Sequence, residues 1–450
     1  MKIKIWYIVV LVLANSCNNQ NHEKRSDSYP EIITREQFEF LEQLTKDVVD
    51  SSRITPGQSV SDQFGPNNSG GNLIRPGGRN CYPSFWIRDY AMSLESEFIG
   101  AEEQRHMLLL TASTQCDQSF ITREGSMIPY GSIADHIRID DGLPIYFPGT
   151  YSYEDQGNKM FGMYPPYDDQ YFFIHMAWYY VKTTSDIKIL NTAIDDYTLS
   201  QRLEASFQVP PSRADNHLVY TTNDFRGVDF GFRDVITITG ELCFTSILKY
   251  RASNEMAELM DMAGSSLKAV KYSEIAAKIK AAIPQFFLDQ RGMLLASTGK
   301  SNQPDVWSTG FAIWLNVLEG KDSEKACSLL ADSYRNGYLA FKGNIRHILT
   351  SDDFSDSTAW EESLAKKDTY QNGAYWGTPT GWICYAISKS DFKLAQEVAG
   401  EYIEDLRKND FRKGGKFGAP YECFHPSGFI QNPVYMTTVT SPYIVFKSMR

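Results

Sequence analysis

The stretch YFFIHMAW at residues 171–178 decides the fold, because it is apolar or aromatic on nearly all of its sides. Two later stretches share this character, FAIWL at 311–315 and WICYAI at 382–387. A helix that is apolar all round must be buried, whereas a charged amphipathic segment such as 395–408 faces water. Buried and water-facing segments alternate along the chain, which predicts an inner layer of helices covered by an outer layer.

Helical periodicity continues on both sides of these stretches, from a capping box at Thr34 and Gln37 to the C-terminal end. Helices are expected at about 34–50, 89–99, 102–114, 168–183, 185–206, 238–252, 254–263, 268–288, 305–319, 322–335, 374–389, 391–409 and 437–449. With 238–252 and 254–263 taken together, they group into six buried and six outer helices. The sequence therefore predicts an all-α (α/α)6 toroid of six helical hairpins, with long loops and short strands gathered at one end. No linker divides residues 34–450, so we expect a single catalytic domain.

Composition excludes some classes of partner. The chain has 450 residues, a net charge of −11 and 13% aromatic residues. No basic stripe is present to neutralise phosphates, so we expect no nucleic-acid partner. The seven histidines are scattered without metal-ligand spacing, and we expect neither a metal nor a cofactor. The many Tyr and Trp side chains suit stacking on sugar rings as well as core packing.

The N-terminus has the pattern of an export signal. Lys2 and Lys4 precede an apolar run at 5–14 that is too short to span a bilayer, and Cys17 follows a small residue. This resembles a bacterial lipoprotein signal, although Ala14 stands where Leu is usual. We expect residues 1–17 to be the signal with Cys17 lipidated, and 18–33 a flexible tether. The protein would then be a periplasmic or outer-membrane lipoprotein of a Gram-negative bacterium, monomeric and attached to the membrane only through its lipid. Ordinary secretion is the alternative.

Six further cysteines remain, an even number that permits disulfides in an exported protein. Cys243, Cys327 and Cys384 lie within apolar helical patterns. Buried free thiols are the expectation for these three.

Two carboxylates stand out in the loops that precede buried helices. Asp229 lies among apolar residues before the third buried helix, and Glu422 lies in an aromatic, Pro- and Gly-rich loop before the sixth. Across a six-membered ring these loops face each other. A desolvated carboxyl has a raised pKa, which suits a general acid, and cleavage of a glycosidic bond uses two carboxyl groups that flank it. We predict Asp229 as acid and Glu422 as base; structural ion pairs are the alternative for both.

Other loop residues are candidates for binding a sugar. Trp86 can pack on a ring face while Arg88 and Asp89 clamp neighbouring hydroxyls, or the pair can form a salt bridge and helix cap. Asp168 and Asp169 can contact substrate or cap the helix that they open. The amide and aromatic residues before the fifth buried helix suit hydroxyl contacts and stacking: Gln371, Asn372 and Trp376.

In motif order the chain resembles the six-hairpin glycosidases, which include glucoamylases, processing α-glucosidases and exo-α-1,6-mannosidases. Residues 85–89, FWIRD, are similar to their sugar-binding stretch. Residues 225–229, FRGVD, and Tyr421-Glu422 are similar to the acid and base segments of the exo-mannosidases. The resemblance implies an inverting glycoside hydrolase acting on an oligo- or polysaccharide. In the exo-mannosidases a second acid follows the catalytic one, whereas Phe230 follows Asp229 here.

Two alternatives stay open. Residues 167–172, YDDQYF, resemble a stretch of the unsaturated uronyl (glucuronyl or rhamnogalacturonyl) hydrolases, in which Asp168 would be the acid and Glu422 would have no role. A glycan-binding lipoprotein without catalysis also fits the tether, the aromatic residues and the acidic charge.

Overall fold

The computed structural model describes residues 31–79 and 81–450. Residues Ile32–Arg450 form one compact unit. The predicted signal, including Cys17, and nearly all of the predicted tether lie outside the described residues. The tether was expected to reach residue 33, but Ile32 and Ile33 are buried and belong to the hydrophobic core.

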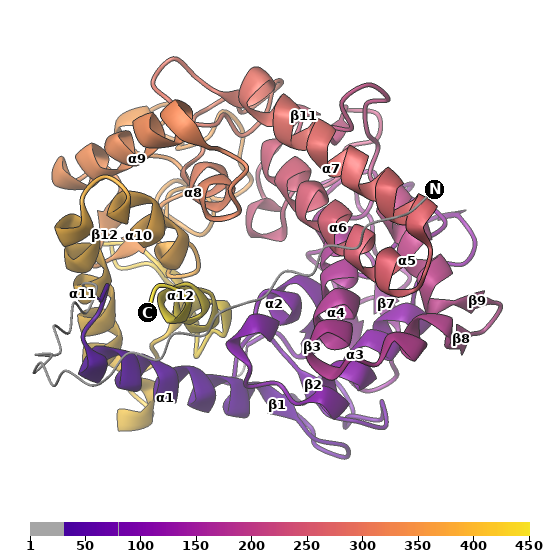
Figure 1. Ribbon diagram of the computed structural model, residues 1–450. Helices are drawn as coiled ribbons and strands as arrows, with labels where there is room; N and C mark the ends of the chain where they lie inside the picture. Colours follow the sequence, from indigo (N-terminus) through magenta and orange to yellow (C-terminus); the bar gives the residue numbers. More distant parts are fainter. Residues whose placement is uncertain (1–30, 80) are drawn as a thin grey trace, which may run out of the picture. The chain divides into compact units, whose positions relative to one another are not determined.

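The described residues form two concentric layers of helices (Figure 1). The inner layer consists of α2 (Ile87–Ala91), α4 (Asp168–Thr184), α6 (Cys243–Met262), α8 (Val306–Trp314), α10 (Thr380–Ser388) and α12 (Thr437–Ser448). The outer layer consists of α1 (Arg35–Ser52), α3 (Ala101–Ser113), α5 (Leu199–Gln208), α7 (Ser266–Phe287), α9 (Gly320–Arg335) and α11 (Phe392–Asn409). Each inner helix packs on the next, and every outer helix packs on an inner one. The predicted (α/α)6 toroid is confirmed.

The ring closes between its first and last inner elements. The 3-10 helix η1 (Leu94–Ser96), which follows α2, packs on α12. Ser93 and Thr440 share a buried hydroxyl–hydroxyl hydrogen bond of 2.8 Å at this seam. The inner helix α4 is buried from Asp168 to Val181, as its apolar sequence predicts, because it is enclosed on both sides by neighbouring helices and outside by α3 and α5.

Five predictions of helix bounds are wrong, and one of them is the helix expected at 305–319, which ends at Trp314. One continuous helix, α6, replaces the two expected at 238–252 and 254–263, because Ser253 bonds to the Lys249 carbonyl within the helix and caps nothing. The helix expected from 185 starts at Leu199, since Ser185 adopts a left-handed conformation that ends α4. The expected helix 89–99 is α2 followed by η1. The helix expected from 374 begins at Thr380, after Tyr375 and Trp376 form bridges to other loops.

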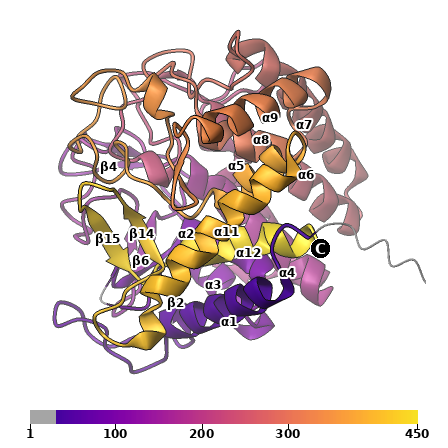
Figure 2. The ribbon, with the colours of Figure 1, turned by 90° about the vertical axis from the view of Figure 1, so that its left-hand side faces the viewer.

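Short antiparallel strands occupy the loops, as predicted. Six pairs are β1 (Arg53–Ile54) with β2 (Leu73–Ile74), β4 (Phe120–Ile121) with β5 (Met127–Ile128), β8 (Ala193–Ile194) with β9 (Tyr197–Thr198), β10 (Tyr220–Thr221) with β11 (Gly240–Glu241), β12 (Ala340–Phe341) with β13 (Asn344–Ile345), and β14 (Tyr421–Phe424) with β15 (Ile430–Pro433). A three-stranded sheet has the order β3 (Ser84–Trp86), β6 (His136–Arg138), β7 (Pro144–Ile145). Figure 2 shows β4, β6, β14 and β15 at the end opposite the C-terminus. The long loops that precede the inner helices meet there.

All six cysteines of the described part are buried free thiols, including the three predicted as such. Within the described residues no helix has the length and apolar character needed to cross a membrane.

Candidate active site

A pocket with about 430 Å³ of empty space opens among the loops at the strand-bearing end of the ring. Its walls combine aromatic rings, three carboxylates, one guanidinium and bare backbone: Pro76, Tyr82, Trp86, Arg88, Asp89, Pro148, Gly149, Gly231, Phe232, Asp234, Tyr370, Glu422 and Tyr435. Four of the predicted site residues are among them, namely Trp86, Arg88, Asp89 and Glu422.

Glu422 is held in a fixed position on the pocket wall. It lies on strand β14, which is paired with β15 in a hairpin, and not in the irregular loop that its Pro- and Gly-rich surroundings predict. Its side chain is buried, with 1% of the residue exposed. The Tyr82 hydroxyl donates to both carboxylate oxygens at 3.2 Å, and Asn432 Nδ2 donates to Oε2 at 2.7 Å. These donors stabilise the ionised form and fix the direction of the carboxylate.

Strained backbone surrounds the same carboxylate. Tyr82, Tyr370 and Asn432 have positive φ angles of 50°, 43° and 29°, although none of them is glycine. Tyr82 and Asn432 donate to Glu422, and Tyr370 lines the pocket beside it. Such residues cost on the order of 1–3 kcal/mol each and persist where the surrounding structure enforces them, commonly at functional sites. The strained residues around Glu422 therefore make it a candidate functional residue on structural grounds, in addition to its sequence context.

Arg88 and Asp89 lie in the first turn of α2, directly after strand β3, which ends at the pocket residue Trp86. Trp86 stacks on His136 with ring centroids 4.2 Å apart, which holds its indole in place. The Tyr435 hydroxyl donates to Asp89 Oδ1 at 2.6 Å. All three side chains lie where the predicted contacts with a sugar can form, but Arg88 has protein partners as well.

Those partners are three buried carboxylates. Arg88 donates through Nε to Asp168 Oδ2 at 3.0 Å and through Nη2 to Asp169 Oδ2 at 2.8 Å and to Asp135. All three aspartate side chains are fully buried, and none lines the pocket. Asp168 and Asp169, predicted to bind substrate, instead support Arg88 from behind. Because one guanidinium is shared by three carboxyl groups, this buried cluster around Arg88 has an excess of acidic groups.

Gly231 contacts this buried cluster and also lines the pocket. Its N–H donates to Asp168 Oδ2 at 2.9 Å, and a Cβ at this position would lie 1.9 Å from Arg88 Nε. Because Arg88 is tied to its carboxylates, its side chain cannot yield to a methyl group.

We therefore expect Gly231→Ala to destabilise the protein by about 1–3 kcal/mol, as overpacking does, and to distort the pocket floor. Urea unfolding checks the first effect and affinity for substrate the second. Gly264→Ala is the control for a glycine with no contact, although its φ of +74° adds local strain. If both variants lost the same free energy of unfolding, the close contact between Gly231 and Arg88 would be contradicted.

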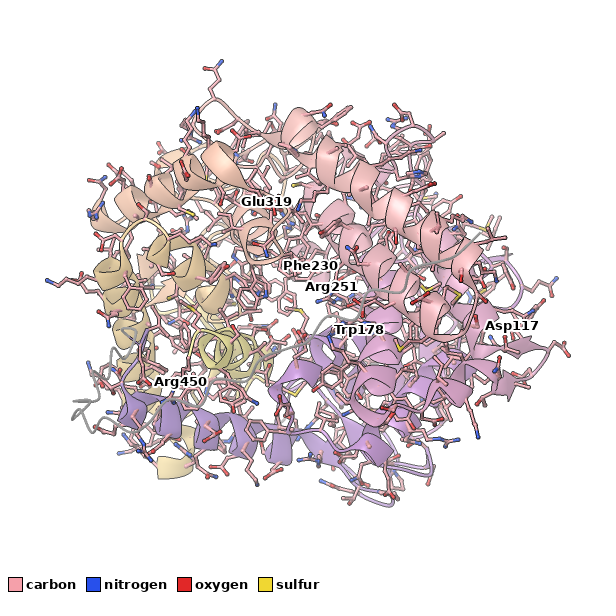
Figure 3. The ribbon with its side chains drawn as sticks, in the orientation of Figure 1. Asp117, Trp178, Phe230, Arg251, Glu319 and Arg450 are labelled. Carbon is pink, nitrogen blue, oxygen red and sulfur yellow. The ribbon has the colours of Figure 1, made fainter. Side chains whose placement is uncertain are left out.

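Asp229 and Asp234 occupy different positions in the loop before α6. Asp229 is 2% exposed, forms an ion pair with Arg233 Nη2 at 3.1 Å, and does not line the pocket with Glu422. Figure 3 shows its neighbour Phe230 near the middle of the ring, in the aromatic core. Asp234 directly follows the 3-10 helix η3 (Gly231–Arg233) and lines the pocket.

The predicted amide and aromatic contacts lie behind the pocket wall. Gln371 Nε2 donates to Asp234 Oδ1 at 2.8 Å and to the Gly231 carbonyl at 3.1 Å. Asn372 bonds to the loop residues Thr358, Ala359 and Ala365. Trp376 is fully buried and packs on other aromatic rings of the core. None of the three predicted side chains lines the pocket.

The pocket carboxyls have raised pKa values. Burial raises the pKa of Glu422 to about 8, with repulsion from Asp89 and Asp234 adding to it. Burial likewise raises the pKa of Asp234 to about 7 and that of Asp89 to about 6. Behind the wall, burial raises the pKa of Asp229 to about 7. The pocket carboxyls therefore titrate near neutral pH, where the pocket can both donate and accept a proton, as acid–base catalysis requires.

Sequence reasoning missed Tyr82, Asp234, Tyr370 and Tyr435. A signal for Asp234 was present, since Arg233-Asp234 repeats the Arg88-Asp89 pair behind an apolar residue in another loop before an inner helix. The three tyrosines carried no such signal, because their roles depend on contacts with distant parts of the chain. Among the described residues, no group of three or more His, Cys, Asp and Glu side chains has the arrangement of a metal site.

Comparison with solved structures identifies the class of fold. The chain is similar to a rhamnosidase from Klebsiella oxytoca with rhamnose bound (12% identity, TM-score 0.55, covering 92% of this chain and 64% of that one). It is also similar to the glucoamylases of Hormoconis resinae (13%, TM-score 0.55, covering 92% and 73%) and Saccharomycopsis fibuligera (10%, TM-score 0.54, covering 92% and 95%). The chain spans 35% of a Bacillus rhamnosidase of family GH78. No protein-family model and no curated protein matches the sequence.

These structural neighbours are glycoside hydrolases of the six-hairpin superfamily. The fold resemblance predicted from motif order is therefore confirmed. At such low identities the likeness establishes the fold, and the particular reaction rests on the pocket.

Proposed function

We propose that the protein is an inverting glycoside hydrolase that removes a terminal, uncharged sugar from an oligo- or polysaccharide. The observation that carries this proposal is the position of Glu422, a carboxylate held by two donors and ringed by strained residues in a pocket with two further carboxyl groups. Glu422 acts as the base that activates water, and a carboxyl on the loop before α6 protonates the leaving group. Asp229 is the acid predicted from the sequence.

The size of the pocket supports action at a chain end. The loops leave a single small pocket, whose empty space is about 430 Å³ even when the open solvent at its mouth is included, and this suits the terminal sugar of a chain more than several consecutive rings. Trp86 and the pocket tyrosines offer apolar faces, and Asp89 can accept hydrogen bonds from hydroxyls.

Charge supports an uncharged substrate. Arg88 is the one cation among the described residues that line the pocket, and it is already bound to three carboxylates. A uronic acid would therefore place its carboxylate beside Asp89, Asp234 and Glu422 without a free partner. The unsaturated uronyl hydrolase alternative is not favoured, since Asp168 lies behind Arg88 and outside the pocket lining. Rhamnose, bound in one of the structural neighbours, is an uncharged sugar.

A panel of glycans tests the proposal. The panel should include chains that end in neutral sugars, chains that end in uronic acids, and unsaturated uronides followed by their absorbance. We expect release of a single monosaccharide from chains that end in neutral sugars. Chains that end in uronic acids should give no product, and the absorbance of the unsaturated uronides should stay constant. Release from unsaturated uronides alone would overturn the assignment, and binding without any product would indicate a glycan-binding protein.

The pH dependence of the reaction follows from the raised pKa values. As pH falls, the base gains a proton and stops accepting one; as pH rises, the acid loses the proton that it must donate. We expect a bell-shaped profile of kcat/KM with both limbs between about pH 6 and about pH 8, the range of the three pocket carboxyls. Rates measured from about pH 4 to about pH 10 check this. An acidic limb near pH 4, where carboxyls in water titrate, would contradict the raised values.

From the sequence alone we also propose that the protein is exported, lipidated at Cys17, and active as a monomer at a bacterial periplasmic or outer-membrane surface. Metabolic labelling with a radioactive fatty acid tests the anchor. Label should enter the wild-type protein and be absent from Cys17→Ala.

A further inference from the structure

We propose that Asp234, and not Asp229, is the general acid of the reaction, and that Gln371 is its positioning residue. This inference rests on the proposed function. A general acid must reach the glycosidic oxygen directly or through one water. Asp234 is partly exposed and lines the same pocket as Glu422.

The ring places the two carboxyls on opposing walls. Asp234 lies in the loop before α6 and Glu422 in the hairpin before α12, the third and sixth inner helices of a ring of six. The proton donor and the water-activating base of an inverting hydrolase flank the scissile bond in this way, far enough apart to admit a water molecule. Both carboxyls contribute to the same electrostatic field, since Asp234 raises the pKa of Glu422.

The immediate surroundings of Asp234 present one oxygen to the pocket. Gln371 Nε2 donates to Oδ1 at 2.8 Å, and Gln371 Oε1 accepts from the Val235 N–H at 2.9 Å, so the amide is fixed at both ends. No described residue donates a hydrogen bond to Oδ2 of Asp234, and this oxygen can carry the proton. Gln371 was predicted to bind sugar; here it orients the acid.

Asp229 has the opposite environment. Both of its carboxylate oxygens are shielded from solvent, and its ion pair with Arg233 is part of a buried chain that continues from Arg233 Nη1 to Asp305 at 2.6 Å. It lines a small cavity together with Asp234, Arg226, Phe161 and apolar neighbours, and this cavity is separate from the pocket that contains Glu422. Asp234 lines both this cavity and the pocket, whereas Asp229 lines the cavity alone.

The proposed step balances without an added reactant. Asp234 Oδ2 gives its proton to the glycosidic oxygen as the C1–O bond breaks, and the alcohol leaves. Water attacks C1 from the opposite face, and Glu422 takes its proton. The products are an inverted hemiacetal and an alcohol, and proton exchange with solvent then restores Asp234 as the acid and Glu422 as the base.

Leaving-group dependence separates the roles. The probes are phenyl and dinitrophenyl glycosides, both anomers, of glucose, mannose, galactose and rhamnose. A dinitrophenolate leaves without protonation, whereas phenolate needs more help from an acid. We expect Asp234→Asn to lose about 10²–10⁴-fold in kcat/KM on the phenyl glycoside and less than about 10-fold on the dinitrophenyl glycoside. Glu422→Gln should lose activity on both.

The matched control is Asp229→Asn, which should affect both substrates equally. If Asp229→Asn showed the leaving-group split and Asp234→Asn did not, the proposal would be overturned. Should Asp234→Asn fail to fold, Gln371→Met takes its place. Gln371→Met should also lose more kcat/KM on the phenyl glycoside than on the dinitrophenyl glycoside, but by a smaller factor. Equal losses on the two substrates would contradict the proposal. Failure of the proposed function would differ from all of these, because the wild-type protein would then cleave none of the probes.

Discussion

Glu422→Gln is expected to reduce turnover by about 10²–10⁴-fold, the usual contribution of a general base, while the fold stays intact. Gln has nearly the same shape as Glu and still accepts from Tyr82 and Asn432 through its carbonyl oxygen. It cannot take a proton from water. Steady-state rates on the glycan identified by the panel, together with circular dichroism, measure the loss. Full activity in this variant would rule out Glu422 as the base.

The same substitution should stabilise the protein at alkaline pH. Burial raises the pKa of the folded-state Glu422 carboxyl to about 8. In the unfolded chain the same carboxyl ionises at a pKa of about 4.3, so above that pH the raised pKa lowers the free energy of unfolding. The penalty grows as pH rises towards the folded pKa and is then constant. We expect Glu422→Gln to be more stable than wild type by on the order of 1–4 kcal/mol at pH 8, with the difference vanishing near pH 4. Urea unfolding at the two pH values checks both points, and a variant less stable at pH 8 would contradict the raised pKa.

Arg88→Met should have the largest effect on stability. Arg88 is the cation that Asp135, Asp168 and Asp169 share, and its side chain is 5% exposed. Removal of one partner from a buried charge cluster typically costs about 3–5 kcal/mol, because the remaining charges are left without a partner. Folding would then require protonation of these carboxyls, so the variant should recover part of its stability as pH falls.

The control for this variant is Arg123→Met. Arg123 also pairs with two carboxylates, Glu154 and Asp155, but 59% of its side chain is exposed. Surface pairs contribute about 0–1 kcal/mol. Urea unfolding of both variants at pH 7 compares them. Equal losses would show that the three aspartates do not depend on Arg88.

The ring could be predicted from sequence because its signal is local. Segments such as 171–178 are apolar on all sides, and this pattern assigns them to the inner layer without knowledge of their neighbours. The position of Glu422, Trp86, Arg88 and Asp89 at the pocket followed from the same order. Each lies in a segment that leads into an inner helix or in its first turn, and these segments meet at one end.

Which carboxyl enters the pocket could not be predicted. Asp229 and Asp234 are five residues apart in one irregular loop. Gln371, 137 positions away, binds the Asp234 carboxyl, whereas Asp229 pairs with Arg233. Asp168 raised the same difficulty. It opens an inner helix at the correct end, but Arg88, 80 positions earlier, covers it. Long-range contacts of this kind leave no periodicity or composition in the sequence.

The most direct test of the central claim is the configuration of the first product. Proton NMR of the hydrolysis mixture within the first minutes, before the released sugar equilibrates in water, shows which anomer forms. With Glu422 activating water on the face opposite the leaving group, the product should have the anomeric configuration opposite to that of the substrate. Release of the sugar with its configuration retained would mean that a carboxylate attacks C1 directly, and would contradict the role of Glu422 as a base.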